Sequence, residues 1–172
     1  MQSKLSNTPV NLAILTVSDT RNEKDDRSGD LLQSRITEAG HNLVSRDLVE
    51  DDVEKIVLKL SQWIDEPNVD VIITTGGTGI TGRDVTPEAV ARLWDKEIPG
   101  FGELFRWISY KIIATSTIQS RACAGVAKGT YIFSLPGSPS ACRDGWDQIL
   151  CFQLDRGHRP CNLVELLPRP VS

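Results

Sequence analysis

The chain has 172 residues and a net charge of -4, from 19 Lys and Arg against 23 Asp and Glu. This length suits one domain, and without a basic cluster we expect no nucleic-acid partner. The apolar runs are far shorter than the ~20 residues of a membrane span, and the start lacks a signal peptide's apolar core, so we expect a cytoplasmic protein with no membrane partner. The chain has four Cys without a C-x-x-C pair and two His, so we expect neither a disulfide framework nor a zinc site. We expect the thiols to lie in or near the core.

Apolar runs alternate with segments of helical periodicity along the chain. In chain order, we expect a strand at 11–17, a helix at 28–40, a strand at 41–49, a helix at 52–64, a strand at 70–75, a helix from 86, a mostly helical or irregular stretch over 98–113, a strand at 130–135 and a helix from 140 to about 154. The segment 96–103 is not expected to form a strand. Alternating strands and helices favour a parallel sheet that is covered on both faces.

Residues with capping preferences mark the ends of the expected helices. Gly40 is expected to end the first helix. Asp51, with Glu54 three residues on, is predicted as the N-cap of the second helix. Thr86 precedes a Pro and is predicted to cap the third helix, and Ser138 is predicted to start the last one.

Three loops follow strands, at Ser18, Gly76 and Pro136. The carboxyl ends of parallel strands share one sheet edge, which is where doubly wound folds bind ligands. We therefore expect these loops, together with Asp51 after the second strand, to meet there. Each polar residue also has a purely local explanation, as an N-cap or as part of a turn.

The loop "TTGGTGITGRDVTPEA" contains Gly77-x-Gly79-x-x-Gly82, the spacing of a dinucleotide fingerprint. A Rossmann site needs this motif directly on a helix, and here residues 83–86 intervene. A P-loop needs Lys and a hydroxyl where this chain has Arg83 and Asp84. A carboxylate beside phosphate makes sense if the ligand arrives as a magnesium complex. Alternatively, the glycines only permit positive φ and Asp84 caps local backbone.

Together with this loop, "IPGFGELFR", "TSTIQSRACAG" and "SLPGSP" resemble the molybdopterin-binding family that includes MogA, MoaB and the gephyrin G domain. The resemblance covers roughly 10–163, and the ending "RPCNLVELLP" looks most like the MoaB branch. It implies a single domain over 1–172, with a core at about 10–163 and short flexible termini. It also implies a three-layer α/β sandwich, with a mostly parallel central sheet flanked by helices on both faces, and a homo-oligomer that in the MoaB branch is a hexamer rather than a trimer.

In catalytically active members of this family, ATP donates AMP to the terminal phosphate of molybdopterin, with Mg2+ present and pyrophosphate released. The resemblance implies that Asp51 and Asp84 are the catalytic carboxylates and act through Mg2+. It further implies these contacts to ATP and molybdopterin: Ser18, Asp19, Gly76, Gly77, Thr78, Gly79, Arg83, Ser120, Arg121, Pro136, Gly137 and Ser138. For Ser120 and Arg121 a solvated helix face is the alternative.

Several features bear on whether this protein catalyses the AMP transfer or only binds its ligands. A phosphate monoester has a second pKa of ~6, so it is largely ionised at neutral pH and needs no general base. Many adenylylating relatives read Ser-Asp-Arg after the first strand, whereas here Arg21 is displaced by one residue. The chain keeps Arg83 and Asp84, which argues for activity. The alternative function is a MoaB-like protein that binds molybdopterin or a pathway partner with little turnover.

Overall fold

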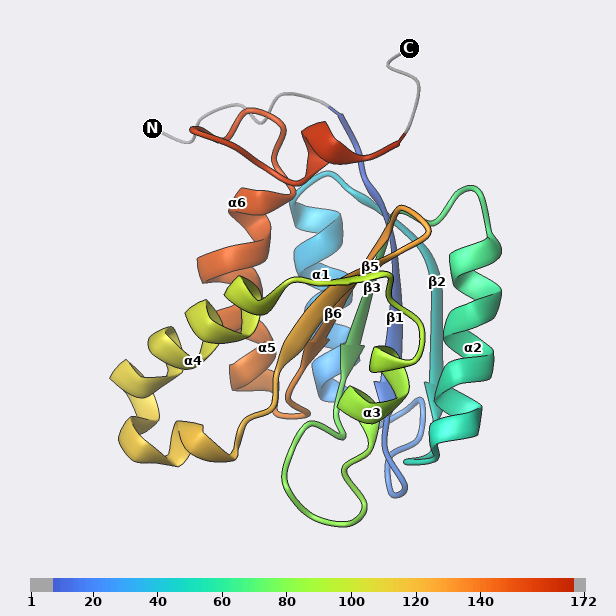
Figure 1. Cartoon of the computed structure of the whole chain (residues 1–172), viewed down its shortest axis with the longest axis vertical. Helices are drawn as coiled ribbons and strands as arrows, with labels where there is room; N and C mark the ends of the chain where they lie inside the picture. Colours follow the sequence, from blue (N-terminus) through green and yellow to red (C-terminus); the bar gives the residue numbers. More distant parts are fainter. Residues whose placement is uncertain (1–7, 169–172) are drawn as a thin grey trace.

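The computed structural model describes residues 8–168 (Figure 1). Of the flexible termini expected on either side of a core at about 10–163, residues 1–7 and 169–172 lie outside the described residues. The elements are β1 (Asn11–Val17), α1 (Arg27–Glu38), β2 (Asn42–Val49), α2 (Val53–Asp65), β3 (Val71–Thr75), α3 (Thr86–Ala91), β4 (Lys96–Glu97), α4 (Pro99–Ile113), the 3-10 helix η1 (Ala114–Gln119), β5 (Cys123–Ala127), β6 (Thr130–Leu135), α5 (Pro139–Gly145), the π-helical turn η2 (Trp146–Leu150), α6 (Cys151–Gln153) and the 3-10 turn η3 (Val164–Leu166).

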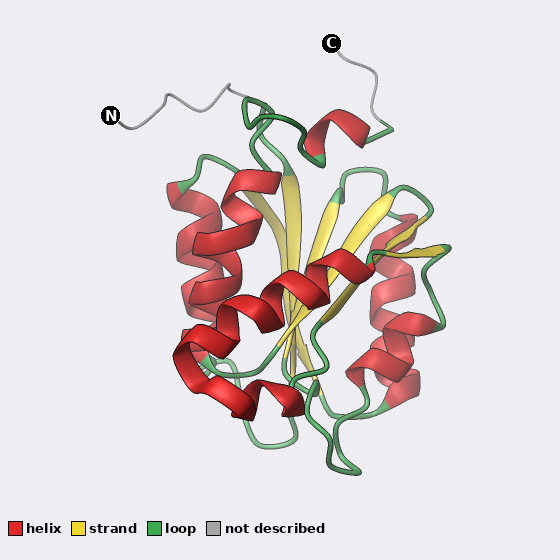
Figure 2. Cartoon of the chain, turned by 60° about the vertical axis from the view of Figure 1, so that its left-hand side comes forward, coloured by secondary structure: helices red, strands yellow, loops and turns green. Residues whose placement is uncertain are grey.

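The central sheet has six strands in the order β2-β1-β3-β6-β5-β4. Strands β2, β1, β3 and β6 are parallel, whereas β5 and β4 are antiparallel to their neighbours. Helices cover both faces of the sheet (Figure 2). The expected three-layer α/β sandwich is therefore confirmed, although the sheet is mixed at one edge.

The antiparallel edge was missed in the sequence. Lys96 and Glu97 form the short strand β4 in a segment that was expected to contain none, because they pair with Val126 and Gly125 of β5. Strand β5 carries small residues instead of the bulky β-branched residues that mark strands. The reason is visible at Gly125, where an added Cβ would lie 2.4 Å from the ring of Trp94. Because β5 packs closely against Trp94, it needs a small residue at Gly125 and lacks the residue pattern by which a strand is usually predicted.

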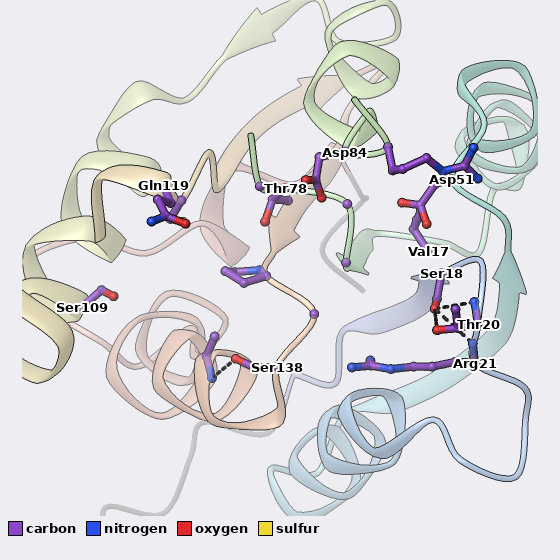
Figure 3. A pocket seen from close by; sticks show the side chains of 18 of the residues that line it. Val17, Ser18, Thr20, Arg21, Asp51, Thr78, Asp84, Ser109, Gln119 and Ser138 are labelled. Carbon is purple, nitrogen blue, oxygen red and sulfur yellow. Dashed lines mark hydrogen bonds between the residues drawn. The ribbon is translucent and has the colours of Figure 1, made fainter. Parts of the chain in front are cut away.

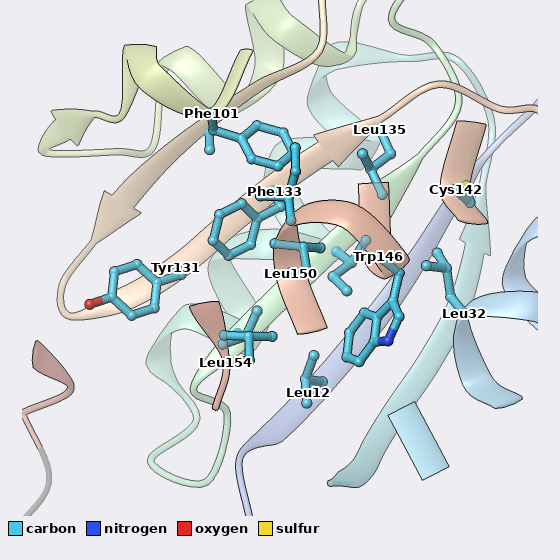
Figure 4. Packing of buried hydrophobic residues seen from close by; sticks show 14 of the residues in the cluster. Leu12, Leu32, Phe101, Tyr131, Phe133, Leu135, Cys142, Trp146, Leu150 and Leu154 are labelled. Carbon is cyan, nitrogen blue, oxygen red and sulfur yellow. The ribbon is translucent and has the colours of Figure 1, made fainter. Parts of the chain in front are cut away.

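Alternation along the strands divides the core into two clusters. Leu12 and Ile14 of β1 face α1, α4 and α5, while Ala13 and Leu15 face α2 and α3. Phe133 of β6 lies in the first cluster, surrounded by aromatic and aliphatic side chains (Figure 4). All five side chains are at most 1% exposed, which is the burial expected of parallel strands covered on both faces.

The aromatic segment of α4 divides between core and surface. Phe101 and Phe105 are core residues, and the Phe101 ring centroid lies 5.1 Å from that of Phe133. Trp107 is 59% exposed, and Lys111 Nζ lies 3.5 Å from its ring centroid. Of these three aromatic side chains, Trp107 is the one at the surface.

Two helix starts differ from those expected. Asp52, not Asp51, caps α2, and its Oδ1 accepts a hydrogen bond from Lys55 N–H at 2.9 Å. Thr86 is the first residue of α3, not its cap, and its hydroxyl donates to Gly76 O at 2.9 Å. As a result, the Asp51 side chain does not cap the helix, and α3 is attached to the glycine loop.

The other expected helix boundaries hold with one exception. Gly40 follows α1 with φ +81°, and the Ser138 hydroxyl oxygen accepts a hydrogen bond from Ala141 N–H at 3.2 Å at the start of α5. The single helix expected over 140–154 is instead α5, η2 and α6, with a π-helical turn at its centre. The expected boundary before α5 is therefore correct.

The cysteines are free thiols, as expected. Cys142 is buried and Cys123 and Cys151 are partly buried, but Cys161 is exposed, so the expectation of core thiols is wrong for this residue. Over residues 8–168, no helix is both long and apolar enough to cross a membrane.

Candidate functional site

A cavity of about 500 Å3 opens at the carboxyl ends of the parallel strands (Figure 3). It lies beside β1 and β3, where the chain order of the sheet reverses direction, the usual ligand position in doubly wound folds. Its lining residues are Val17, Ser18, Thr20, Arg21, Asp51, Gly76, Gly77, Thr78, Gly79, Arg83, Asp84, Phe105, Ser109, Ile113, Gln119, Ser120, Pro136, Gly137, Ser138 and Ala141. The loops expected to meet at this edge do so.

Backbone hydrogen bonds fasten the loops of the cavity to neighbouring strands. Ser18 N–H donates to Val49 O at 2.9 Å, which joins the ends of β1 and β2. Gly76 N–H donates to Leu135 O at 3.0 Å, which joins the ends of β3 and β6. The positions of the site loops are therefore set by the sheet.

Two glycines of the loop after β3 are required by close packing. Gly76 has φ +103°, and an added Cβ would lie 2.2 Å from Val17 O. Gly77 has φ +70°, and an added Cβ would lie 2.3 Å from Thr86 Oγ1 and 3.0 Å from Asp51 Oδ1. Side chains rarely adopt this backbone conformation, and there is no space for one. Gly77 thus lets the Asp51 carboxylate lie against the glycine loop.

Asp84 is held within its own loop. Its Oδ2 accepts hydrogen bonds from Thr81 N–H at 2.9 Å and Thr81 Oγ1 at 2.7 Å. Burial acts to raise the pKa of Asp84, but these bonds and one from the Gly79 backbone outweigh it and lower the pKa. Asp84 therefore caps local backbone, as one interpretation of the sequence held, and also presents a fully ionised carboxylate to the cavity.

Asp51 has a different electrostatic environment. Burial raises the pKa of Asp51, and the neighbouring charge of Asp19 raises it further, with a smaller effect from Asp84. The backbone N–H of Asp51 donates to Asp19 Oδ1 at 3.0 Å. This hydrogen bond joins the loop after β2 to the loop after β1. A partly buried carboxylate beside two others is stabilised by any cation that enters the cavity.

Arg83 and Asp19 form an ion pair at the cavity mouth. Arg83 Nε donates to Asp19 Oδ2 at 2.8 Å, and its Nη2 contacts the same oxygen. This hydrogen bond, followed by the one from the Asp51 backbone, lowers the pKa of Asp19. The Arg83 side chain is 72% exposed and lines the cavity, whereas Asp19 is not among the lining residues. Asp19 therefore positions Arg83 and Asp51 from outside the cavity.

Ser120 and Arg121 belong to an extended segment between η1 and β5, so the alternative of a solvated helix face is wrong. Ser120 lines the cavity, but Arg121 does not. Arg121 Nε donates to Gly79 O at 2.7 Å and its Nη2 to Asp84 O at 2.9 Å, while its Nη1 pairs with Glu88. Arg121 therefore holds the glycine loop in place from outside the cavity.

One wall of the cavity was missed in the sequence. Phe105, Ser109 and Ile113 of α4 and Gln119 of η1 form this wall. Figure 3 shows Ser109 and Gln119 across the opening from Ser18 and Arg21. Their spacing of four residues along α4 marks one helical face, but nothing in it distinguishes a cavity wall from a core face. Arg21 also lines the cavity, one position after the place where the family pattern has an Arg.

The carboxylates suit magnesium only in combination with a phosphate ligand. Among the described residues, no three His, Cys, Asp or Glu side chains cluster as a metal site. Asp51 and Asp84 both line the cavity, however, and Mg2+ is commonly held by one or two carboxylates together with substrate phosphates and water. The donor set therefore fits an ion that arrives with a nucleotide.

Fold and cavity together define an α/β domain with a cavity at the switch point of its sheet, lined by glycine backbone, hydroxyl groups, carboxylates and arginines. The sequence matches the family described as a probable molybdopterin binding domain over residues 13–156. The chain therefore belongs to this family.

Named relatives and solved structures agree with this assignment. The chain is 49% identical over 154 residues to Molybdenum cofactor biosynthesis protein B of Escherichia coli (strain K12), covering 90% of this chain and 91% of that protein. It is similar to a crystal structure of Molybdenum cofactor biosynthesis protein B, with a TM-score of 0.83, 47% identity and coverage of 86% and 92%. The tungsten cofactor synthesizing protein MoaB from Pyrococcus furiosus has a TM-score of 0.76, 38% identity and coverage of 83% and 91%. The resemblance to the MoaB branch is confirmed.

Proposed function

We propose that this protein acts in molybdenum cofactor biosynthesis by transferring AMP from Mg-ATP to the terminal phosphate of molybdopterin. The observation that carries the proposal is the meeting of Asp51, Asp84 and the glycine loop in one cavity, although they follow different strands. Family membership supports molybdopterin as a ligand. The cavity volume of about 500 Å3 lies within the usual range for small-molecule sites.

The reaction balances without an added acid or base. An oxygen of the molybdopterin phosphate attacks the α-phosphorus of ATP, a new P–O bond forms, and the bond to the bridging oxygen of the β-phosphate breaks. That electron pair leaves with pyrophosphate. The attacking monoester has a second pKa of ~6 and is already mostly a dianion at neutral pH. The need is therefore to neutralise and align two anions, as in other phosphoryl-transfer sites.

Each part of the cavity has a role in this proposal. Asp51 and Asp84 would hold Mg2+, which neutralises nucleotide phosphate charge when bound. The backbone of Gly76 to Gly79 lines the cavity and lets phosphate approach closely. Ser138 and the preceding turn form the wall on the far side of the glycine loop (Figure 3). Ile113, beside the buried Phe105, contributes apolar surface suited to a flat heterocycle.

We also propose that the protein assembles as a homo-oligomer, a hexamer in preference to a trimer. Support comes from a group of large apolar side chains on α4 and η1, each at least 41% exposed. Its members are Leu104, Trp107, Tyr110, Ile112, Ile113 and Ile118. Clustered exposed apolar surface of this kind marks protein contacts. The same wall lines the cavity at Ile113, so assembly and ligand binding share one element.

The deciding experiment is a turnover assay with purified protein, molybdopterin, ATP and Mg2+ under anaerobic conditions. We expect adenylyl-molybdopterin and pyrophosphate in equal amounts. Asp84→Asn should lower turnover about 100- to 1000-fold, since it removes a charge needed at the reacting phosphates. Absence of product, with molybdopterin shown to be bound, would instead identify a binding or scaffold protein of the pathway.

A further inference from the structure

Arg21 differs from the other arginines near the cavity. Arg83 pairs with Asp19, and Arg121 pairs with Glu88. Arg21 lines the cavity and is half-buried, and no carboxylate of residues 8–168 forms an ion pair with it. A guanidinium in a cavity without a carboxylate partner is available to an anionic ligand.

A buried network fixes the position of Arg21. Arg21 Nη1 donates to Ser28 Oγ at 2.9 Å, and the Ser28 hydroxyl donates to Asp26 Oδ1 at 3.4 Å. Asp26 is 2% exposed and also accepts from Thr16 Oγ1 at 2.6 Å and Arg46 Nη2 at 3.0 Å. Burial opposes ionisation of Asp26, but hydrogen bonds, that of Thr16 first, lower its pKa.

The direction of these hydrogen bonds follows from the ionised carboxylate. Asp26 can only accept, so the single proton of the Ser28 hydroxyl is directed at it. The hydroxyl oxygen of Ser28 is then left to accept a hydrogen bond from Arg21 Nη1. This bond holds the guanidinium at one of its nitrogens. Within residues 8–168, Nε and Nη2 of Arg21 have no hydrogen-bond partner, and the side chain lines the cavity.

Arg21 lies on the opposite side of the cavity from the carboxylates. Figure 3 shows its side chain reaching toward Ser138, with Asp51 and Asp84 on the other side of the opening. Arg21 Nη2 is 3.9 Å from the position of a Cβ built on Gly137, so the guanidinium lies beside the turn after β6. The cavity therefore has an acidic side and a basic side.

We infer that Arg21 binds the phosphate monoester of the acceptor substrate, with Ser28 and Asp26 as positioning residues. This inference rests on the proposed function, in which two anions must meet. The nucleotide brings a metal ion to the acidic side, at Asp51 and Asp84. The acceptor phosphate brings no ion, so its charge must be met by the protein. Of the two arginines that line the cavity, Arg83 is paired with Asp19, whereas Arg21 has no carboxylate partner within residues 8–168.

The test uses two ligands that differ only in this phosphate, molybdopterin and its dephosphorylated form, with binding measured by equilibrium dialysis without ATP. Arg21→Gln should weaken molybdopterin binding about tenfold, the value of one charge-assisted contact at a partly exposed site, and leave the dephosphorylated ligand unaffected. Arg27→Gln is the matched control, because Arg27 is an exposed arginine at the start of α1 outside the cavity, and it should change neither affinity.

Ser28→Ala tests the positioning role. It should weaken molybdopterin binding less than Arg21→Gln does, and it should have no further effect when combined with that substitution. A merely structural contribution of Ser28 would persist in the double variant and would reduce binding of both ligands. Arg21→Lys should restore part of the affinity for molybdopterin, because it returns the charge without the fixed fork of the guanidinium.

The outcomes separate this inference from the proposed function. Equal losses for both ligands with Arg21→Gln, unchanged binding of molybdopterin, or no binding by the wild-type protein would each overturn the role of Arg21. A phosphate-dependent loss supports it. If the wild-type protein shows that pattern and still forms no adenylyl product, only the proposed transfer reaction fails.

Discussion

Asp51 and Asp84 line the same cavity, but replacing each by Asn should change stability in opposite directions. The pKa of Asp51 is raised, by burial first and then by Asp19, so its ionised form is disfavoured in the folded state. The pKa of Asp84 is lowered by the bonds from Thr81 and Gly79, so its ionised form is favoured. Asn keeps the shape and one acceptor oxygen, removes the charge and replaces the other oxygen by an NH2 donor.

Asp51→Asn should therefore raise the free energy of unfolding by about 0.5 kcal/mol, a small value because Asp51 is partly exposed and solvent screens its neighbours. Asp84→Asn should lower it by about 0.5 to 1 kcal/mol through loss of a charge-assisted bond. At 2–4 °C per kcal/mol for a chain of this size, Tm should rise by about 1–2 °C and fall by about 1–4 °C, respectively. Both variants should lose about 100-fold or more in kcat.

The pH dependence provides a second measurement. A raised folded-state pKa means that Asp51 destabilises the fold only once it ionises, so the gain of Asp51→Asn should be complete at pH 7 and vanish in acid. The lowered pKa of Asp84 contributes stability above the unfolded value near 3.8, which is lost as pH falls further. The loss caused by Asp84→Asn should therefore also disappear in acid.

The assays are thermal unfolding from pH 3 to pH 8 and pyrophosphate release at pH 7. Asp65→Asn serves as a control, since Asp65 is an exposed carboxylate on α2 paired with Lys128, and it should leave kcat unchanged. A fall in Tm for Asp51→Asn as large as that for Asp84→Asn would refute the electrostatic argument. Full activity in either variant would refute the assigned role of that carboxylate.

Three further predictions concern the loop, the metal ion and the assembly. Gly77→Ala should cost about 1–3 kcal/mol, because φ is +70° and Thr86 Oγ1 blocks the Cβ, whereas Gly82→Ala, with nothing within 4 Å, should be nearly neutral in urea unfolding. EDTA should abolish turnover without lowering Tm, since Mg2+ arrives with the nucleotide; a lower Tm would indicate a resident ion. Ile118→Asp should reduce the mass in light scattering, and Leu58→Asp, an equally large exposed side chain on α2, should not; an unchanged mass with Ile118→Asp would place the contact elsewhere.

The sequence alone predicted the order of the elements, apart from β4 and β5, and the glycine loop that follows β3. Strands β1, β3 and β6 are continuous apolar runs because helices cover them on both faces, and such runs are a local signal. Parallel strands also force their carboxyl ends to one edge, so the convergence of Ser18, Gly76 and Pro136 followed from topology. Asp84 was placed for the same reason, being part of one continuous loop.

Only the tertiary structure decided what completes the site. A shift of one residue in the start of α2 decides whether Asp51 or Asp52 caps the helix. The same shift decides which of the two carboxylates lines the cavity. The position of Arg21 at the cavity depends on its hydrogen bond to Ser28. Gln119 lines the cavity from η1, which is distant in the sequence from the other loops. A helix face that lines a cavity has the same residue pattern as one that packs in a core, because periodicity records burial and not what lies opposite.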